Sequence, residues 1–177
     1  TRSMAIVGVI GICLLLIASG VVVAQQGEIR ADGNPNIDVF AAENTFTPGQ
    51  ADTLVLQINN DGELRRGQET DRELVTTARS TVVDVDTEGT PLEVTSRQRS
   101  VGTVTENEPR ETRFSVDVPN SAEPGTYTVD VEISYSYTSR VRQTEGIIDQ
   151  NQRSRSVTRT VDIEISDDAR FRVDNVN

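Results

Sequence analysis

An uncharged run opens the sequence, and it constrains the chain more than any other feature. Residues Met4 to Ala24 contain no charged side chain, whereas Gln25 to Asn177 carry all 28 carboxylates and 16 of the 17 arginines. An apolar stretch of about 20 residues is long enough to cross a membrane as a helix. We therefore expect residues 1–24 to be a signal peptide or membrane anchor, and the remainder to be exported.

Two fates remain open for this segment. Val22-Val23-Ala24 before Gln25 offers the small or modest residues that a signal peptidase needs, whereas an uncleaved helix would stay in the membrane. Arg2 is the only charge on its amino side and predicts a cytoplasmic N-terminus. Lipidation at Cys13, a third possibility, is disfavoured because Ile12 stands where a lipobox needs a small residue.

The charge of the exported part excludes some partners. Its 16 arginines oppose 28 carboxylates, which gives a net charge of −12, and the chain has no lysine. Such a surface repels nucleic acid and anionic lipid, so we expect no nucleic-acid partner and expect anionic lipid to be a poor one. Molar salt shortens the Debye length to about 3 Å and removes most of the self-repulsion, so the composition favours a salt-rich, halophilic exterior. The alternative is an acidic protein from an ordinary environment that favours arginine codons.

The exported part has the residue pattern of an all-β fold. Strict alternation of apolar and polar residues over 127–137 predicts a long, half-buried strand whose inward residues are Tyr127, Val129, Val131, Ile133, Tyr135 and Tyr137. Shorter alternating runs, separated by Pro, Gly and Asn-Asp-Gly turns, lie around residues 37–39, 54–58, 83–85, 92–94, 114–118 and 161–165.

This pattern predicts an immunoglobulin-like β-sandwich of about seven or more strands. The spacing of several runs, 8 to 12 residues, is the spacing found in such sandwiches. We assign the sandwich domain to residues 37–169, a linker to residues 25–36, and an exit strand or the start of a following module to residues 170–177. Tyr127 follows Pro124-Gly125, where sandwiches often place a tyrosine whose hydroxyl bonds back to the preceding corner.

The residue inventory argues against catalysis. The chain has no histidine, and its single cysteine is Cys13, so Ser-His-Asp and Cys-His nucleophiles and His or Cys zinc sites are not available. We expect no enzyme and no cofactor. A weak metal candidate is Asp84, Asp86 and Glu88 before Gly89, which resembles the start of an EF-hand loop. A solvated strand face that ends in a turn explains these residues as well.

One connection is basic in this acidic chain. The segment between the strands near Tyr137 and Val157 carries Arg140, Arg142, Arg153 and Arg155, with Ile147 and Ile148 near its middle. Forked guanidiniums around two apolar residues suit docking onto an acidic neighbour, such as another copy of this module. Alternatively, the segment is a long hairpin whose arginines pair with nearby carboxylates and whose isoleucines fold back on the sandwich.

Several motifs together resemble a known family. They are Pro48-Gly49, residues 53–64 with their Asn-Asn-Asp-Gly turn, Thr76-Thr77-Ala78-Arg79, residues 122–127 and residues 167–171. From Ile37 to Val176 the chain resembles the first domain of haloarchaeal S-layer-like surface proteins. These are built from immunoglobulin-like modules related to the CARDB adhesion domain and to the NPCBM-associated accessory domain of alpha-galactosidases. The resemblance implies no fixed catalytic residues.

Two function classes follow from these observations. In the first, the chain is a non-catalytic cell-surface or envelope module, structural or adhesive, that acts through contacts with other surface modules or with itself. In the second, it is an extracytoplasmic binding or accessory subunit of a membrane exporter or a carbohydrate-active system. In both, the protein is exported, and the membrane is a partner if Met4 to Ala24 stays uncleaved.

Overall fold

In its described part, the protein is an all-β sandwich with one short α-helix. The computed structural model describes residues 28–166. In chain order its elements are β1 (Arg30–Asn34), β2 (Ile37–Glu43), β3 (Thr45–Phe46), β4 (Ala51–Asn60), β5 (Glu63–Arg66), the 3-10 helix η1 (Glu69–Asp71), α1 (Arg72–Thr76), β6 (Ala78–Asp86), β7 (Glu93–Val94), β8 (Gln98–Val104), β9 (Arg110–Asp117), β10 (Gly125–Thr144) and β11 (Ile147–Ile165).

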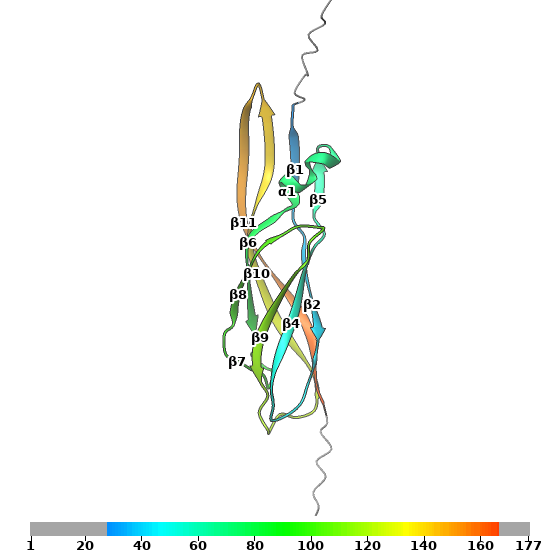
Figure 1. Cartoon of the computed structure of the whole chain (residues 1–177), viewed down its shortest axis with the longest axis vertical. Helices are drawn as coiled ribbons and strands as arrows, with labels where there is room; N and C mark the ends of the chain where they lie inside the picture. Colours follow the sequence, from blue (N-terminus) through cyan, green and yellow to red (C-terminus); the bar gives the residue numbers. More distant parts are fainter. Residues whose placement is uncertain (1–27, 167–177) are drawn as a thin grey trace, which may run out of the picture.

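These strands form two sheets that enclose the core. The larger sheet contains the path β3-β11-β10-β1-β5; β6 also pairs with β10, and β8 pairs with β6. The smaller sheet has the order β2-β4-β9-β7. All pairings are antiparallel except the short contact of β11 with β3. The two sheets lie along one axis, which makes the molecule an elongated rod (Figure 1).

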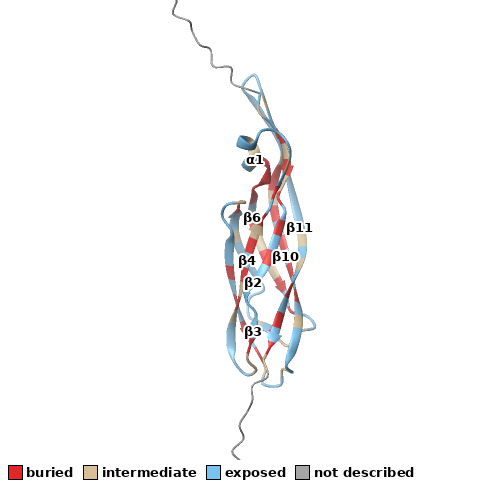
Figure 2. Cartoon of the chain, turned by 90° about the vertical axis from the view of Figure 1, so that its right-hand side faces the viewer, coloured by how far each residue is buried: buried red, intermediate tan, exposed pale blue. Residues whose placement is uncertain are grey.

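Strand alternation produces the core. Inward residues of β4, β6, β9, β10 and β11 are almost fully buried, and buried segments line the inner faces of the two sheets (Figure 2). The long alternation expected around residues 127–137 is confirmed, because β10 alternates buried and exposed residues there. Both core clusters of the described residues consist of residues after Gln25, so we expect a chain that begins at Gln25 to fold.

Strand β10 is longer than the sequence indicates and changes partners along its length. It pairs with β11 over 19 positions, from Gly125 opposite Ile165 to Thr144 opposite Ile147. On its other edge it pairs first with β6 and then with β1. A bulge between Thr138 and Arg140 marks the change. Beyond it, β10 and β11 continue as a hairpin that projects from the sandwich (Figure 1). We call residues 138–156 the arm, which comprises this hairpin and, at its base, the four β11 residues that pair with Ser134 to Tyr137.

A second, smaller core supports the root of the arm. Ala31 of β1, Val75 of α1 and Val141 of β10 are buried against one another, with Ile29 and Leu64 packed around them. The sequence assigned residues 25–36 to a linker, but Arg30–Asn34 form β1, which pairs with both β10 and β5. The local Gly, Asn and Pro content disfavours a strand; the two neighbouring strands and the buried Ala31 override it.

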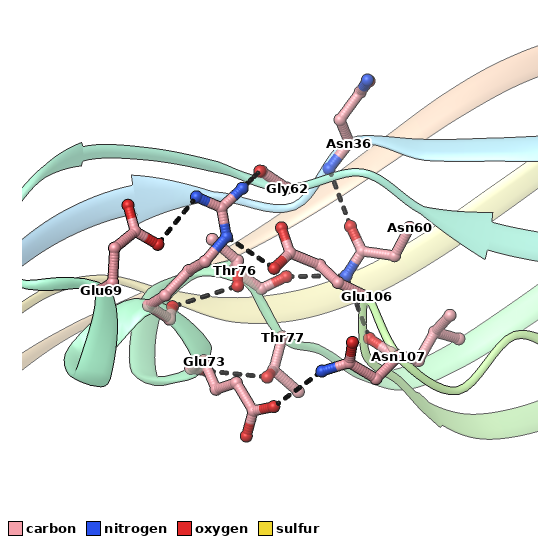
Figure 3. Close-up of polar contacts among 11 residues, drawn as sticks. Asn36, Asn60, Gly62, Glu69, Glu73, Thr76, Thr77, Glu106 and Asn107 are labelled. Carbon is pink, nitrogen blue, oxygen red and sulfur yellow. Dashed lines mark hydrogen bonds and ion pairs between the residues drawn. The ribbon is translucent and has the colours of Figure 1, made fainter.

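A buried amide joins the two sheets below the arm (Figure 3). Asn60 ends β4 and is only 6% exposed. Its Nδ2 donates to the carbonyl of Thr76 at 2.8 Å and to that of Val104 at 3.1 Å, and its Oδ1 accepts from the backbone N–H of Asn36 at 3.1 Å. One side chain thus satisfies backbone groups from three separate segments.

An ion pair holds α1 to the same junction. Arg72 Nε lies 2.6 Å from Glu106 Oε2, and its Nη2 donates to the Gly62 carbonyl at 2.6 Å (Figure 3). The hydrogen bond with Glu106 raises the pKa of the Arg72 guanidinium above its ordinary value. Because α1 also carries Val75 of the small core, this junction fixes the root of the arm relative to the sandwich.

Some sequence predictions fall outside the described residues. These are the Met4 to Ala24 segment, Cys13 and the exit strand at residues 170–177. Within residues 28–166, no helix is long and apolar enough to span a membrane.

The junction predicts a large effect of Asn60→Ala on stability. The substitution leaves two carbonyls and one N–H buried without their partner, which should lower the free energy of unfolding by roughly 2 to 4 kcal/mol. Denaturant unfolding of residues 25–177 measures it. The neighbouring Asn59 is the matched control: its Oδ1 has no hydrogen-bond partner among the described residues, so Asn59→Ala should cost about 1 kcal/mol or less. Equal losses would show that the Asn60 hydrogen bonds do not stabilise the fold.

Candidate functional site

The arm carries the six residues singled out as partner-binding candidates. Arg140 and Arg142 lie on β10, Arg153 and Arg155 on β11, and the two isoleucines start β11 directly after the turn. Ile147 is 73% exposed and Ile148 is 59% exposed. The isoleucines therefore do not fold back on the sandwich. We call Ile147, Ile148 and the Glu145-Gly146 turn the tip.

The root of the arm forms a basic cleft. Its volume is about 300 Å³, and its charged lining residues are Asp32, Arg65, Arg66, Arg140 and Arg153. Arg140 Nε donates to Asp32 Oδ1 at 2.5 Å, and Arg66 Nη1 lies 3.7 Å from Asp32 Oδ2. The hydrogen bond from Arg140 lowers the pKa of Asp32 below its ordinary value. Four guanidiniums against one carboxylate leave the cleft positive.

The other arginines of the arm are placed differently. Arg142 stands opposite Arg30 on β1 and opposite Asp149 on β11. Arg155 stands opposite Tyr135, whose hydroxyl lies in the protein interior. Burial raises the pKa of the Tyr135 hydroxyl, and the nearby positive charge of Arg155 acts against that shift. The structure thus gathers Arg140 and Arg153 in the basic cleft and leaves Arg142 and Arg155 to its sides.

The opposite face of the arm root is acidic. Ala31 and Val141 face α1 in the small core, so alternation turns Asp32 and Arg140 to the other face. On the α1 side Glu69 and Glu73 are exposed and Asp71 is half-buried between them; the Glu69 carboxylate lies 3.5 Å from Arg72 Nη1, so three carboxylates stand beside one cation. We call Glu69, Asp71 and Glu73 the helix corner. The basic cleft and the helix corner therefore lie on opposite faces at the same level of the rod.

Like charges also stand opposite each other on the outer face of the large sheet. Asp84 of β6 is directly opposite Glu132 of β10, and Asp86 is opposite Asp130. Like charges in directly opposed positions destabilise a sheet. We call these four residues the acidic sheet face.

The weak metal candidate of the sequence is not assembled in the structure. Asp84 and Asp86 end β6, and Glu88 lies in the turn that follows. Asp86 Oδ1 accepts a hydrogen bond from the Glu88 backbone N–H at 3.0 Å and faces Arg97 at 4.0 Å. In the described part of the chain, no three His, Cys, Asp or Glu side chains come together as a metal-binding group. The segment is a strand end and a turn.

A second cleft lies beside the Asn60 junction. It has a volume of about 430 Å³ and is lined by Asn36, Asp38, Phe40, Gln57, Asn59, Asn60, Asp61, Glu106 and Pro109. Phe40 is 51% exposed. Buried oxygens of Asn59 and Glu106 have no hydrogen-bond partner within residues 28–166. The cleft combines an exposed aromatic ring with several amide and carboxylate groups.

The tyrosine corner expected from the sequence is present. The Tyr127 hydroxyl donates to the carbonyl of Glu123 at 3.0 Å. Pro124 and Gly125 make the turn between them, and Gly125 has a φ of 156°, a region that favours glycine. These three residues therefore fix the start of β10, which then runs to the tip.

Sequence reasoning missed half of the basic cleft. Arg65 and Arg66 end β5, and Asp32 lies in the segment that was assigned to a linker. The adjacent arginine pair after the Asn-Asp-Gly turn was a usable signal, because two consecutive cations are unusual in so acidic a chain. Their approach to the arm depends on β1 lying between β5 and β10, which only the sheet topology shows.

The acidic sheet face predicts salt-dependent stability. The thermal unfolding midpoint of residues 25–177 should rise between dilute buffer and molar KCl, because salt screens the opposed carboxylates. In the Asp130→Asn/Glu132→Gln double variant, the midpoint in dilute buffer should be higher and the rise with salt smaller.

A matched control removes two carboxylates that pair with arginine. Asp38 contacts Arg159 Nε at 3.1 Å, and Glu111 contacts Arg113. Asp38→Asn/Glu111→Gln changes the net charge equally but relieves no such repulsion. If both double variants reduce the salt effect equally, net charge rather than the acidic sheet face is responsible.

Comparisons with known proteins add little to the description of the fold. No family model matches the chain, and no curated protein matches it. Among solved structures it is similar to the sporulation control protein Spo0M from Bacillus subtilis, with 12% sequence identity and a TM-score of 0.30. The similarity covers 76% of this chain and 50% of the Spo0M chain. This chain therefore spans about half of that protein's length.

Proposed function

We propose that this protein is a non-catalytic, exported envelope module, structural or adhesive, that acts through contacts with neighbouring modules. Its sandwich is of the immunoglobulin-like type, for which the two packed sheets and the Tyr127 corner are support. The resemblance to S-layer-like surface proteins agrees with this role. The absence of histidine and the position of the only cysteine, Cys13, favour binding over catalysis.

The observation that carries the proposal is the placement of opposite charges on opposite faces. The basic cleft and the helix corner stand at one level of the rod, separated by the thickness of the arm root. Copies that stand side by side in the same orientation bring the basic cleft of one against the helix corner of the next. This is a heterologous contact, which continues from copy to copy as a row rather than closing as a dimer.

The shape of the module suits a place in an envelope. The described chain begins beside the arm and leaves β11 at the opposite end of the long axis (Figure 1). A module that receives the chain at one end and releases it at the other separates whatever is attached to the two ends. Together with Met4 to Ala24 as an export segment, this supports a position outside the membrane with the arm towards it.

The second cleft favours the alternative function. An exposed Phe40 beside amide and carboxylate groups is an arrangement that a binding or accessory subunit of a carbohydrate-active system would use. A protein that stays monomeric at all concentrations in the association experiment below would favour this alternative over contacts between copies.

Export predicts how the protein fractionates in cells. If Met4 to Ala24 stays uncleaved, the protein should remain in the membrane fraction after a carbonate wash, because a buried apolar helix is not released. External protease should degrade the body in intact cells. A soluble form that begins at Gln25 would identify the segment as a signal peptide only. Protection of the body until the cells are lysed would contradict export.

The contact between copies predicts a charge-dependent association. At high protein concentration, residues 25–177 should form larger species in sedimentation, and Arg153→Glu should abolish them by placing a carboxylate in the basic cleft. Asp71→Arg should do the same from the other side of the contact, and the Asp71 side chain caps no helix N–H. A mixture of the two variants should recover association, because the intact helix corner of Arg153→Glu meets the intact basic cleft of Asp71→Arg, and the two substituted surfaces meet in the other contact.

Arg97→Glu is the matched control for this experiment. Arg97 is 63% exposed and lies beside Asp86, away from the arm. It should leave association unchanged. An equal loss with Arg153→Glu and Arg97→Glu, which change the net charge by the same amount, would show that association follows net charge and not the basic cleft.

A further inference from the structure

The tip of the arm exposes apolar surface that the fold does not use. Ile147 and Ile148 are the two most exposed large apolar residues within residues 28–166. Across the hairpin they stand opposite Thr144 and Gln143, which are polar. Consecutive strand residues point to opposite faces, so both faces of the ribbon are apolar at its end.

The hairpin turn itself does not require these isoleucines. Glu145 and Gly146 form a two-residue loop with φ values of 51° and 82°, the positive pair that a type I′ turn needs. That turn fixes the register of the hairpin and accepts polar residues on either side of it. The isoleucines therefore need another explanation.

The tip lies beside the point where the chain arrives from its N-terminal segment. The backbone N–H of Gln143 donates to the carbonyl of Ile29 at 2.8 Å, and Gln143 stands opposite Ile148. Ile29, Gln143 and Ile148 are thus neighbours on three adjacent chain segments. Since adjacent strands lie about 4.8 Å apart, the backbones of Ile29 and Ile148 are about 10 Å apart.

Chain length limits how far the end of the apolar run can be from the tip. Four residues lie between Ala24 and Ile29, so the five steps from one Cα to the other span at most about 17 Å in any conformation. β1 runs antiparallel to β10, with Arg30 opposite Arg142, so the chain before β1 lies towards the tip. A Met4 to Ala24 helix in a bilayer therefore places the membrane surface within reach of Ile147 and Ile148.

We propose that the tip inserts Ile147 and Ile148 into the outer surface of the lipid bilayer, as a second attachment beside the N-terminal helix. The inference rests on the proposed function, because it needs an exported module that is anchored in the membrane. Apolar side chains at the boundary of headgroups and acyl chains contribute binding in proportion to the area they bury. Two isoleucines bind weakly alone, but the anchor holds them at a high effective concentration.

A lipid layer fits the tip better than a neighbouring copy does. The arm extends past the other elements along the long axis (Figures 1 and 2), so a copy standing alongside covers one face of the ribbon only. A layer of lipid covers both faces and the end. Arg30 and Arg142 lie next to the tip, where their guanidiniums reach headgroup phosphates. They also offset the charges of Glu145 and Asp149.

The consequence is a fixed orientation of the module. A single helix with a short connection leaves the rod free to tilt. The helix and the tip together define two points of contact with the membrane, because Ile148 of the tip lies about 10 Å from Ile29, where the connection from the helix ends. The rod then stands upright on the membrane. Neighbouring copies are held at one height, which the contact between the basic cleft and the helix corner requires.

A tryptophan reporter tests the proposal, because the chain has no tryptophan of its own. The full chain with Ile147→Trp is placed in phosphatidylcholine vesicles, with and without bromine on the acyl chains. We expect a blue shift of the emission and a marked loss of intensity with brominated lipid. Ile148→Ser added to this variant should reduce both effects. Ser121→Trp is the control, because Ser121 is exposed in the loop before β10, at the other end of the rod.

The outcomes separate this inference from the proposed function. If the vesicles float with the protein and the indole of Ile147→Trp is quenched no more than that of Ser121→Trp, the tip does not insert and the anchor remains. If the protein does not float, the anchored module and the tip contact both fail. A blue shift that grows with the protein-to-lipid ratio, without bromine quenching, assigns the tip to a contact between copies and overturns its insertion.

Discussion

The rest of the structure depends on the pairing of β10 with β11. This ladder runs over 19 positions from the Tyr127 corner to the tip, and it connects the sandwich to the arm without interruption. β10 has only one other edge, which it shares between β6 in the sandwich and β1 in the arm. The bulge at Ser139 is where this exchange occurs. A bulge increases strand twist locally, and here it turns the arm towards β1 and α1.

Acidic and basic side chains are distributed differently in the sandwich and at the root of the arm. In the sandwich, β6 and β10 place carboxylates opposite each other on their outer face, and Arg97 is the cation that forms an ion pair there within residues 28–166. At the root of the arm, arginines from β5, β10 and β11 surround the single carboxylate of Asp32. The net charge of the whole chain hides this separation. A surface that is acidic on average can therefore still present a positive cleft to an acidic partner.

The sequence predicted the strands that alternate cleanly and missed those that do not. β10 was evident up to Tyr137, because inward and outward residues differ sharply. β8 has one buried residue, Val104, and no period to detect. α1 is a single turn of five residues, too short for a helical pattern. β1 contains Gly and Asn, and it forms because β10 and β5 supply pairing partners on both sides. Long-range pairing of this kind produces no local pattern in the sequence.

The same limit applies to the candidate surfaces. The arginines of the arm and the exposed isoleucines were visible in the sequence, because they interrupt an acidic pattern. The sequence did not show that these residues belong to two separate surfaces, the basic cleft and the tip. Arg140 and Arg153 join Arg65 and Arg66 only through the position of β1, and Ile148 lies beside Ile29 only through the bond from Gln143. These relations combine residues more than 70 positions apart, so spacing along the chain cannot supply them.

Salt distinguishes the two surfaces physically. At molar ionic strength the Debye length is about 3 Å, so the basic cleft attracts carboxylates only at hydrogen-bonding distance. There the planar fork of a guanidinium still selects a carboxylate by geometry, because two parallel hydrogen bonds need no long-range field. Molar salt does not weaken the attraction of the apolar tip for an apolar partner, because apolar burial does not depend on charge screening. If the protein works in a salt-rich exterior, the proposed roles divide accordingly: the tip would supply attachment and the basic cleft would supply specificity of contact. An arm that carried only one of these features would either attach without order or align without attachment.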